Sequence, residues 1–486
     1  SYQKDFFNSG LQKARKSSIK GYVFGDCNDR NRTAAFLDKL LLHKIKVYEV
    51  ENEISRNGDT FCKESAFIVP TNQLQYRMVQ TMFETYDQYV DSVFYDASAW
   101  SVANFYNIPY QELTGNISLG KEVTDIKGFV KSNEFRPSKY AYLIKWEDYN
   151  AHAALYYLQD HGVRTLSSFK PFEIQINNKL ERFGYGTVLI PVSRQAISKD
   201  SLDRLVKSVS LECKIDIWPT NTGYSTSGID LGSGNINPLK KPEVAMLVEG
   251  SVSSYEAGEV WHILDTRLNM PITKVPIRNF KRLDLDNYNT LVLVSGRYEG
   301  LDSMDRMKIS SWVKKGNTLI TSRSASEWAI KQKLVKEKLV EDIEDKKNAD
   351  EPTRKPYVDA RENIGKNRVG GAIFEVELDI SHPLAFGYTR KSLPVYRNST
   401  VWLTPSKNSY ATVAKYSKNP HIDGFITKKN LNEKLKGSAS LLVSKLGSGR
   451  VVLFADNPNF RGSWYGTNKL FLDAIFLGQH VNVPNE

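Results

Sequence analysis

Strand-like and helix-like segments alternate along most of this chain of 486 residues, and the alternation restricts the folds open to it. Short apolar runs predict strands, and apolar residues spaced three and four apart predict helices. In the first half the predicted strands are 22–24, 45–50, 66–69, 140–146, 163–166 and 187–191, and the predicted helices are 31–42, 74–89, 149–160 and 201–209. Strands that alternate with helices predict an α/β fold with a mostly parallel sheet and covered faces.

The alternation restarts at Val244 and predicts a doubly wound α/β domain with five strands. Its strands are expected at 244–248, 272–277, 290–294, 318–321 and 450–455, and its helices at 257–268, 303–315, 324–334 and 467–478. Residues 370–445 lose helical periodicity and read as short strands. The sequence therefore predicts a β-rich insertion before the last strand of this domain.

Changes in amino-acid composition along the chain indicate where the domain boundaries lie. The run 219–242 is rich in Gly, Ser, Asn, Thr and Pro, which predicts a linker or an ordered functional loop. We expect residues 1–19 to be a lead-in from a preceding domain, and residues 20–218 to form an α/β region, which a break near 120–139 could divide into two subdomains. Residues 219–242 are then the linker. Residues 243–486 form the last domain, with an insertion at about 345–445.

The net charge of +11 is spread along the chain rather than gathered into a basic stripe. We interpret it as scattered surface lysines, so no nucleic-acid partner is predicted. No apolar run reaches the ~18–20 residues of a membrane span. Three cysteines, Cys27, Cys62 and Cys213, include no CxxC pair, so no disulfide framework is predicted. Cys27 follows a predicted strand, where either a nucleophile or an inert thiol would fit.

Zinc peptidases hold their metal through patterns such as HxxE or HExxH together with a third ligand. None of the seven histidines begins such a pattern. His262 and Asp265 form an HxxD, but they lie in a predicted amphipathic helix that also carries Trp261. We therefore expect no metal and no other cofactor in this chain.

The turn after the predicted strand 318–321 is where a class I glutamine amidotransferase places its cysteine nucleophile. Here the turn reads Ser-Arg-Ser-Ala-Ser over 322–326, without a cysteine, and the late segment DNPNFRGSW has no histidine. The sequence therefore predicts no catalytic residue. A hydrolase that uses Ser322 or Ser324 is the alternative.

Ligands of open α/β sheets bind at the carboxyl ends of the strands. A ligand site is therefore predicted from residues that follow the strands of the last domain, where arginine could bind a carboxylate. These residues are Glu249, Ser251, Arg297, Ser322, Arg323, Asp456 and Asn457. We expect Glu249, Arg297, Arg323 and Asp456 to converge there. Two other interpretations stay open, ordinary turn residues and a structural cluster of ion pairs.

Long segments of the chain resemble the carboxyl-terminal region of large bacterial zinc carboxypeptidase-like proteins. In the second half they are GIDLGSGNINPLKKPEVAMLVEG, YEAGEVWHILDTRLNMPITKV, SHPLAFGY and DNPNFRGSWYGTNKLFLDAIFLG. In the first half they are YVFGD, FIVPTNQLQYRMVQTMFE and FYDASAWS. The last domain also resembles glutamine amidotransferase-like and β-galactosidase trimerisation-like domains, in which the amidotransferase nucleophile is often lost.

The resemblance implies a role. The zinc carboxypeptidase domain of that family would lie upstream, so zinc is expected only there, and the parent would be periplasmic or secreted. This chain is then expected to be a non-catalytic accessory, binding or assembly region, with the upstream domain as a partner and a peptide or the cell wall as a ligand. A carbohydrate-binding module that uses exposed aromatic side chains is a further alternative.

Overall fold

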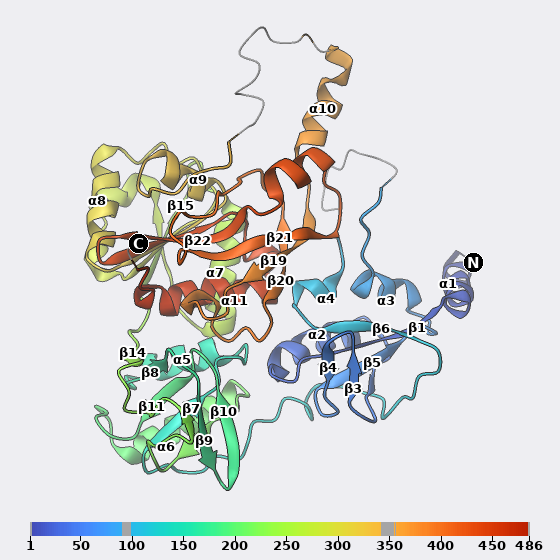
Figure 1. The fold of residues 1–486 in the computed structure, drawn as a ribbon, viewed down its shortest axis with the longest axis horizontal. Coiled ribbons are helices and arrows are strands. Elements are labelled where there is room, and N and C mark those ends of the chain that lie inside the picture. The colour runs from blue at the N-terminus through green and yellow to red at the C-terminus, as the bar shows by residue number, and fades with distance from the viewer. Residues whose placement is uncertain (1, 90–98, 342–353, 355, 485–486) are drawn as a thin grey trace. The chain divides into compact units, whose positions relative to one another are not determined.

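The computed structural model describes residues 2–89, 99–341, 354 and 356–484, and the chain divides into two units (Figure 1). Unit 1 comprises Ser1–Glu84, Ser101–Lys241 and Phe386–Thr389. Unit 2 comprises Thr85–Trp100, Pro242–Ala385 and Arg390–Glu486. No helix in the described ranges is long and apolar enough to cross a membrane.

Unit 1 is built from two consecutive halves. The first half contains α1 (Tyr2–Lys16), β1 (Ile19–Gly25), α2 (Arg30–Leu42), β2 (Tyr48–Glu49), β3 (Ile54–Arg56), β4 (Asp59–Phe61), β5 (Ala66–Pro70), α3 (Tyr76–Phe83), α4 (Val102–Phe105) and β6 (Tyr110–Thr114). The second half contains β7 (Ala141–Ile144), α5 (Ala151–Asp160), β8 (Leu166–Ser168), β9 (Phe172–Ile176), β10 (Lys179–Phe183), β11 (Val188–Pro191), α6 (Lys199–Glu212), β12 (Trp218–Thr220), β13 (Ser227–Gly228) and β14 (Ile236–Pro238).

The two halves of unit 1 have the same topology. The first sheet has the order β2-β5-β1-β6, and the second has β8-β11-β7-β12 with β14 added beside β8. Each half follows the path strand, helix, strand, hairpin, strand, helix, strand, which is a ferredoxin-like split βαβ arrangement with an added hairpin. Unit 1 is therefore an internal structural repeat, and the chain passes from one half to the other between 114 and 141.

The mixed α/β class predicted from the alternation is confirmed, but the parallel sheet expected for 20–218 is wrong. Every strand pair in the two main sheets of unit 1 is antiparallel. The reason is that β5 inserts between β1 and β2, and β11 inserts between β7 and β8. Each strand–helix–strand segment does return in the same direction, but its two strands are separated by a third strand that runs the opposite way.

The segment 219–242 is not a free linker, because it contributes strands to unit 1. Within it, β12 pairs with β7, β13 with β9, and β14 with β8. Its polar residues form the turns between these strands, which is why composition alone resembled a linker. The expected lead-in also has structure: Gly10 and Ala14 of α1 are buried, and Arg77 lies 4.7 Å from the ring centre of Phe6.

Unit 2 has a sheet of nine strands. Its elements are β15 (Val244–Val248), α7 (Ser254–Leu268), β16 (Thr273–Pro276), β17 (Thr290–Leu293), α8 (Ser303–Lys314), β18 (Thr318–Ser322), α9 (Ser324–Lys331), α10 (Ala360–Asn367), β19 (Ala372–Leu378), β20 (Ser392–Arg397), β21 (Thr412–Asp423), β22 (Ala439–Leu446), β23 (Gly449–Phe454) and α11 (Tyr465–Leu477). Five parallel strands lie in the order β16-β15-β17-β18-β23, which is the doubly wound, flavodoxin-like order 2-1-3-4-5.

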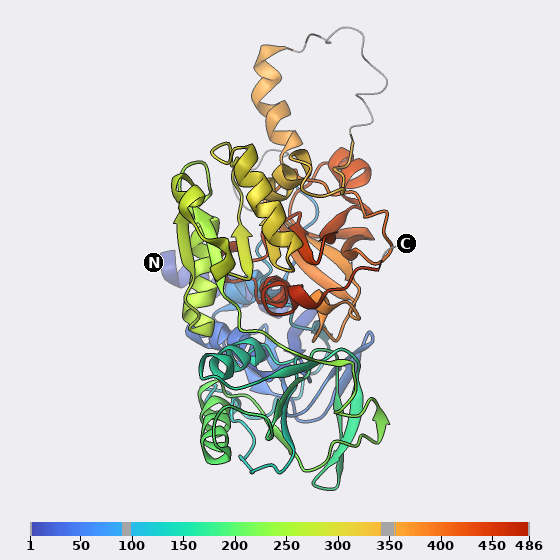
Figure 2. The ribbon, with the colours of Figure 1, turned by 90° about the vertical axis from the view of Figure 1, so that its left-hand side faces the viewer.

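The β-rich insertion extends this sheet instead of forming a separate body. Strands β22, β21, β19 and β20 continue it beyond β23, and each neighbouring pair is antiparallel. They are the orange to red arrows of Figures 1 and 2. The start of the predicted insertion, from 345 to 353, lies outside the described residues. The last helix, α11, is buried almost all round, because it packs beneath the extended sheet.

Candidate ligand site at a strained turn of unit 2

Arg323 occupies the sharp turn between β18 and α9. Its backbone has φ 50° and ψ −120°, a strained conformation for a residue with a side chain. The Arg323 amide donates to the Phe454 carbonyl at 2.9 Å, and the Arg323 carbonyl accepts from the Ser326 amide at 2.9 Å. A strained strand-to-helix turn of this kind exposes the nucleophile in enzymes that have a nucleophile elbow. Here the exposed position carries an arginine.

An ion pair fixes the Arg323 side chain. Its Nη1 lies 2.5 Å from Oε1 of Glu256, and its Nη2 donates to the Asn398 carbonyl at 3.0 Å. The Glu256 side chain is 5% exposed and the Arg323 side chain 25%. The other oxygen of Glu256 accepts from the Ser295 amide at 3.0 Å, so this glutamate joins the end of β17 to the turn. Glu256 was absent from the predicted site, although its place in the first turn of a helix that follows a central strand was a usable signal.

The two serines beside Arg323 have structural surroundings. Ser322 ends β18 and is buried. The Ser324 hydroxyl accepts from the Gly296 amide at 3.0 Å and lies 3.3 Å from the Gly296 carbonyl. Within the described part of the chain, neither hydroxyl is hydrogen-bonded to a histidine or a carboxylate. No base among the residues that the structure describes is therefore in position to activate either serine.

Two residues of the predicted site lie in other, solvent-exposed ion pairs. Glu249 pairs with Arg278 at 2.5 Å. Arg297 lies 3.8 Å from Glu299, and both of these side chains are about three-quarters exposed. The expected convergence of all four charged residues is therefore wrong. The strands do end at one edge, but the turns after β15 and β17 direct these long side chains into solvent. Ser251, in the turn after β15, is partly buried.

Asp456 lies in a buried cluster. Its Oδ1 is 2.8 Å from Nη1 of Arg397, and its Oδ2 accepts hydrogen bonds from the hydroxyls of Tyr416 and, at 3.3 Å, Ser440. Burial raises the pKa of Asp456 above its ordinary value, while Arg397 and, further away, Arg323 act to lower this pKa. Arg323 and Asp456 therefore have different partners, Glu256 and Arg397.

Asn457 lies in a separate group of hydrogen bonds, apart from those of Arg323 and Asp456. Its Nδ2 donates to Oε2 of Glu259 at 2.6 Å, and the other oxygen of Glu259 accepts from the Arg461 amide at 2.6 Å. Burial is the main cause that raises the pKa of Glu259. These bonds join α7 to the segment after β23, so Asn457 holds the edge of the sheet together.

A cavity of about 710 Å³ opens at the strained turn. Its wall includes Arg323 and Ser324 from the turn, Arg361 and Arg368 from α10 and the residue after it, and the loop 398–401. Among the residues that the structure describes, Arg361 and Arg368 make no ion pair. Among the described residues of this wall, Glu327 is the one carboxylate, and it pairs with Lys331. The arrangement suits an anion such as a carboxylate, which arginine binds in a fork-like geometry.

Sequence reasoning missed Arg361 and Arg368 because they lie more than 35 residues after the turn, beyond a run of mixed charge. Nothing in their local pattern indicates that α10 returns to the carboxyl edge of the sheet. In the described ranges, no three His, Cys, Asp or Glu side chains are grouped so that they could hold a metal ion.

The strand order and the turn define a flavodoxin-like α/β unit with an arginine at the strained turn between β18 and α9. No model of a known protein family matches the chain, and no curated protein matches it. Among solved structures, PurLQS from Thermotoga maritima is 12% identical with a TM-score of 0.32, over 48% of this chain and 96% of that chain. A glutamine amidotransferase from Thermotoga maritima is 12% identical with a TM-score of 0.29, over 45% of this chain and 76% of that one.

A β-galactosidase from Bacillus circulans is also similar, with 14% identity and a TM-score of 0.24, over 50% of this chain and 32% of that chain. Glutamine amidotransferase-like folds are thus among the structural neighbours. Because every TM-score is low, the flavodoxin-like description of unit 2 rests on its own strand order.

Proposed function

We propose that this chain is a non-catalytic binding region whose unit 2 binds a carboxylate-bearing ligand in the cavity beside Arg323. The observation that carries the proposal is the identity of the residue at the strained turn. An arginine there cannot attack an acyl group, and its side chain, bonded to Glu256 and to the Asn398 carbonyl, forms part of the cavity wall. Arg361 and Arg368 add two further cations to the same wall.

The setting of this region in a longer protein is part of the proposal. The resemblance of the long segments supports a place downstream of a zinc carboxypeptidase-like domain in a periplasmic or secreted protein, and zinc would be bound there. The disulfide between Cys27 and Cys62 supports an oxidising compartment. A peptide with a free terminal carboxylate is then the ligand class to test first. The sequence encoded upstream checks this setting, because an HxxE-bearing domain is expected there.

Binding of a carboxylate is expected to depend on the arginines of the cavity. Trialanine with a free carboxyl terminus should bind to the full chain in calorimetry, and trialanine amide should not. Arg368→Ala should weaken binding by about tenfold to a hundredfold, since a charge-assisted hydrogen bond contributes roughly 1.5–3 kcal/mol. Arg368 is exposed and makes no ion pair in the described structure, so the melting temperature should stay unchanged.

Arg297→Ala is the matched control, because Arg297 is also an exposed arginine of unit 2 and does not line the cavity. Its affinity for trialanine should equal that of the wild type. Equal loss in Arg297→Ala and Arg368→Ala would mean that only the overall positive charge attracts the peptide, which contradicts a built site.

The serines at the strained turn between β18 and α9 are expected not to react as nucleophiles. A serine-directed phosphonate should label neither Ser322 nor Ser324, because one is buried and the other is bonded to the backbone of Gly296. Intact mass spectrometry after incubation measures this, with a serine hydrolase as the positive control. A stoichiometric adduct on either serine would overturn the non-catalytic proposal and favour the hydrolase alternative.

A further inference from the structure

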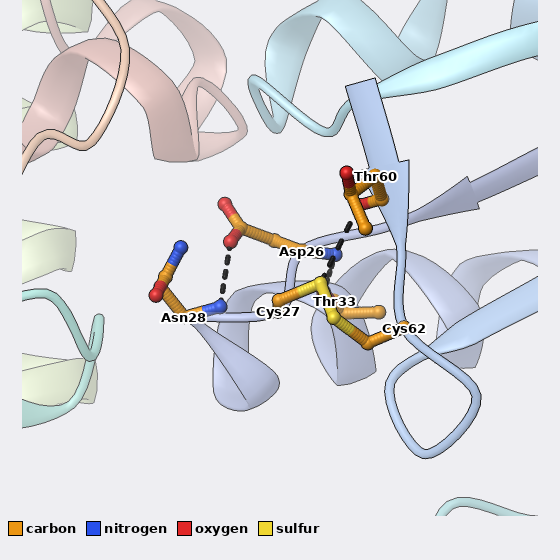
Figure 3. The surroundings of a disulfide bond; sticks show 6 residues. All are labelled: Asp26, Cys27, Asn28, Thr33, Thr60 and Cys62. Atoms are coloured by element: carbon orange, nitrogen blue, oxygen red, sulfur yellow. Dashed lines mark hydrogen bonds between the residues drawn. A yellow bond between two sulfur atoms is a disulfide. The ribbon is translucent and has the colours of Figure 1, made fainter. Parts of the chain in front are cut away.

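Unit 1 contains a cleft of about 770 Å³ between its two ferredoxin-like halves. Equivalent strand-to-helix turns of the repeat form two of its walls. Cys27, Asn28 and Arg30 follow β1, and the segment 145–148 follows β7. The disulfide partner Cys62 lines the cleft as well, so the covalent bond drawn in Figure 3 is part of the wall.

The two turns hold each other by reciprocal hydrogen bonds. The Asn31 side-chain amide of the first turn donates to both carboxylate oxygens of Asp148, each at 2.9 Å. The Tyr149 amide of the second turn donates to Asp29 at 3.1 Å. Within the first turn, the Asn28 amide donates to Asp26 at 2.8 Å, which Figure 3 shows beside the disulfide. These bonds fix the turns that carry Asn28, Arg30 and Asp148 on the wall of the cleft, and such preorganisation lowers the cost of binding.

On the wall of the cleft every cation has a carboxylate partner, but two of the carboxylates have no cation partner in the part of the chain that the structure describes. Its three cations each have a carboxylate partner: Arg30 pairs with Asp216 at 3.2 Å, Lys145 with Glu181 at 3.1 Å, and Arg182 with Glu173 at 2.5 Å. Glu64 and Asp148 also line the cleft, and neither makes an ion pair within the described residues. Although the whole chain is basic, this cleft therefore has two carboxyl groups, Glu64 and Asp148, that lack an ion-pair partner among the described residues.

Lys145 shows how the wall holds an ammonium group. Its Nζ lies 4.7 Å from the ring centre of Trp218 and 5.4 Å from that of Phe183, beside the carboxylate of Glu181. Aromatic faces and carboxylates together stabilise a partly desolvated cation. Glu64 and Asp148 have no ion-pair partner among the described residues, so the same chemistry suits the ammonium group of a ligand.

We propose that this cleft binds a primary ammonium group on an aliphatic chain, with Glu64 and Asp148 as its carboxylate partners. This site is independent of the carboxylate site of unit 2, so either proposal can fail alone. The ammonium could come from a lysine side chain of a peptide or from a free diamine, and the experiment separates these sources.

The pH dependence of binding follows from Asp148. Burial, and then the nearby carboxylate of Asp29, raise the pKa of Asp148 to about 7. Above this pKa the carboxylate is charged, whereas an alkylammonium stays protonated up to about pH 10. Affinity should therefore rise by up to about tenfold from pH 6 to pH 8. The charged or titratable groups that face Asp148 are Asp29 and Arg30 at the start of α2, Glu147 in its own turn, and Cys213 and Asp216 after α6.

The test is calorimetry on the full chain at pH 6, 7 and 8 with three probes. They are Gly-Lys-Gly blocked at both ends, the same peptide acetylated on the lysine Nζ, and 1,5-diaminopentane. The wild type should bind the first or the third probe and not the acetylated peptide. Glu64→Gln should weaken binding by about tenfold without loss of folding, because this side chain is exposed. Asp148→Asn should weaken binding at pH 8 and abolish its pH dependence.

Glu53→Gln is the matched control, since Glu53 is an exposed glutamate of the same half that does not line the cleft. Binding of the peptide alone, or of the diamine alone, identifies the source of the ammonium. Absence of binding by both amines overturns the proposal. So does equal binding of the acetylated peptide, or a loss in Glu53→Gln that matches the loss in Glu64→Gln.

Discussion

Replacement of Asp456 by alanine is expected to lower the free energy of unfolding of unit 2 by about 3–5 kcal/mol. The variant leaves the guanidinium of Arg397, which is 0% exposed, without its carboxylate partner. Arg397 would keep the Tyr416 hydroxyl at 3.0 Å and the Val401 carbonyl, but neither carries a negative charge. At the usual scaling for a unit of this size, the melting temperature should fall by about 10 °C, which differential scanning calorimetry measures.

A solvent-exposed pair of the same unit is the matched control. Arg278→Ala breaks the contact with Glu249, where the side chains are 73% and 49% exposed, and should change stability by less than about 1 kcal/mol. The double variant Arg397→Met with Asp456→Leu should be more stable than Asp456→Ala, because it leaves no buried charge unpaired. Equal melting temperatures for Asp456→Ala and Arg278→Ala would show that the buried pair does not stabilise the sheet.

Removal of the disulfide is expected to cost unit 1 about 4 kcal/mol. Cys27 and Cys62 are separated by 35 residues, and a crosslink over a loop of that length restricts the unfolded chain by roughly this amount. The variant Cys27→Ser with Cys62→Ser should therefore unfold at a lower urea concentration than the wild type. Wild-type protein in reducing buffer should unfold at the same concentration as the variant.

Cys213→Ser is the control for a change of cysteine without loss of the bond, because Cys213 is a free thiol. Burial raises the pKa of this thiol to about 12, so it stays protonated near neutral pH and should not exchange with the disulfide. If reduction leaves the unfolding midpoint of the wild type unchanged, the crosslink does not contribute as expected.

Periodicity located most elements to within a few residues. The predicted strand 244–248 coincides with β15, and the predicted helix 31–42 with α2 (Arg30–Leu42). Helix 74–89 was predicted too long, since α3 ends at Phe83 and a β-extended Glu84 follows it. Such patterns are local, because they arise from the spacing at which side chains of one element meet a core.

These local patterns do not indicate whether neighbouring strands pair in parallel or antiparallel. In unit 2 each central strand is followed by a crossover helix, so alternation gave the parallel order correctly. In unit 1 the same local pattern occurs in antiparallel sheets, because β5 and β11 lie between the two strands of a strand–helix–strand segment. The internal repeat of unit 1 becomes visible in the shared strand order of its two halves.

For the candidate sites, residue types and spacing predict that Arg323 follows a central strand, with no cysteine in the turn and no histidine in the late segment DNPNFRGSW. Which charged side chains meet depends on three-dimensional packing. Arg323 pairs with Glu256 and Asp456 with Arg397, and a disulfide joins Cys27 to Cys62, which lies 35 residues later in the chain. Partners of this kind lie tens of residues apart, and their distances depend on how strands and turns pack in three dimensions, which no local spacing of residues encodes.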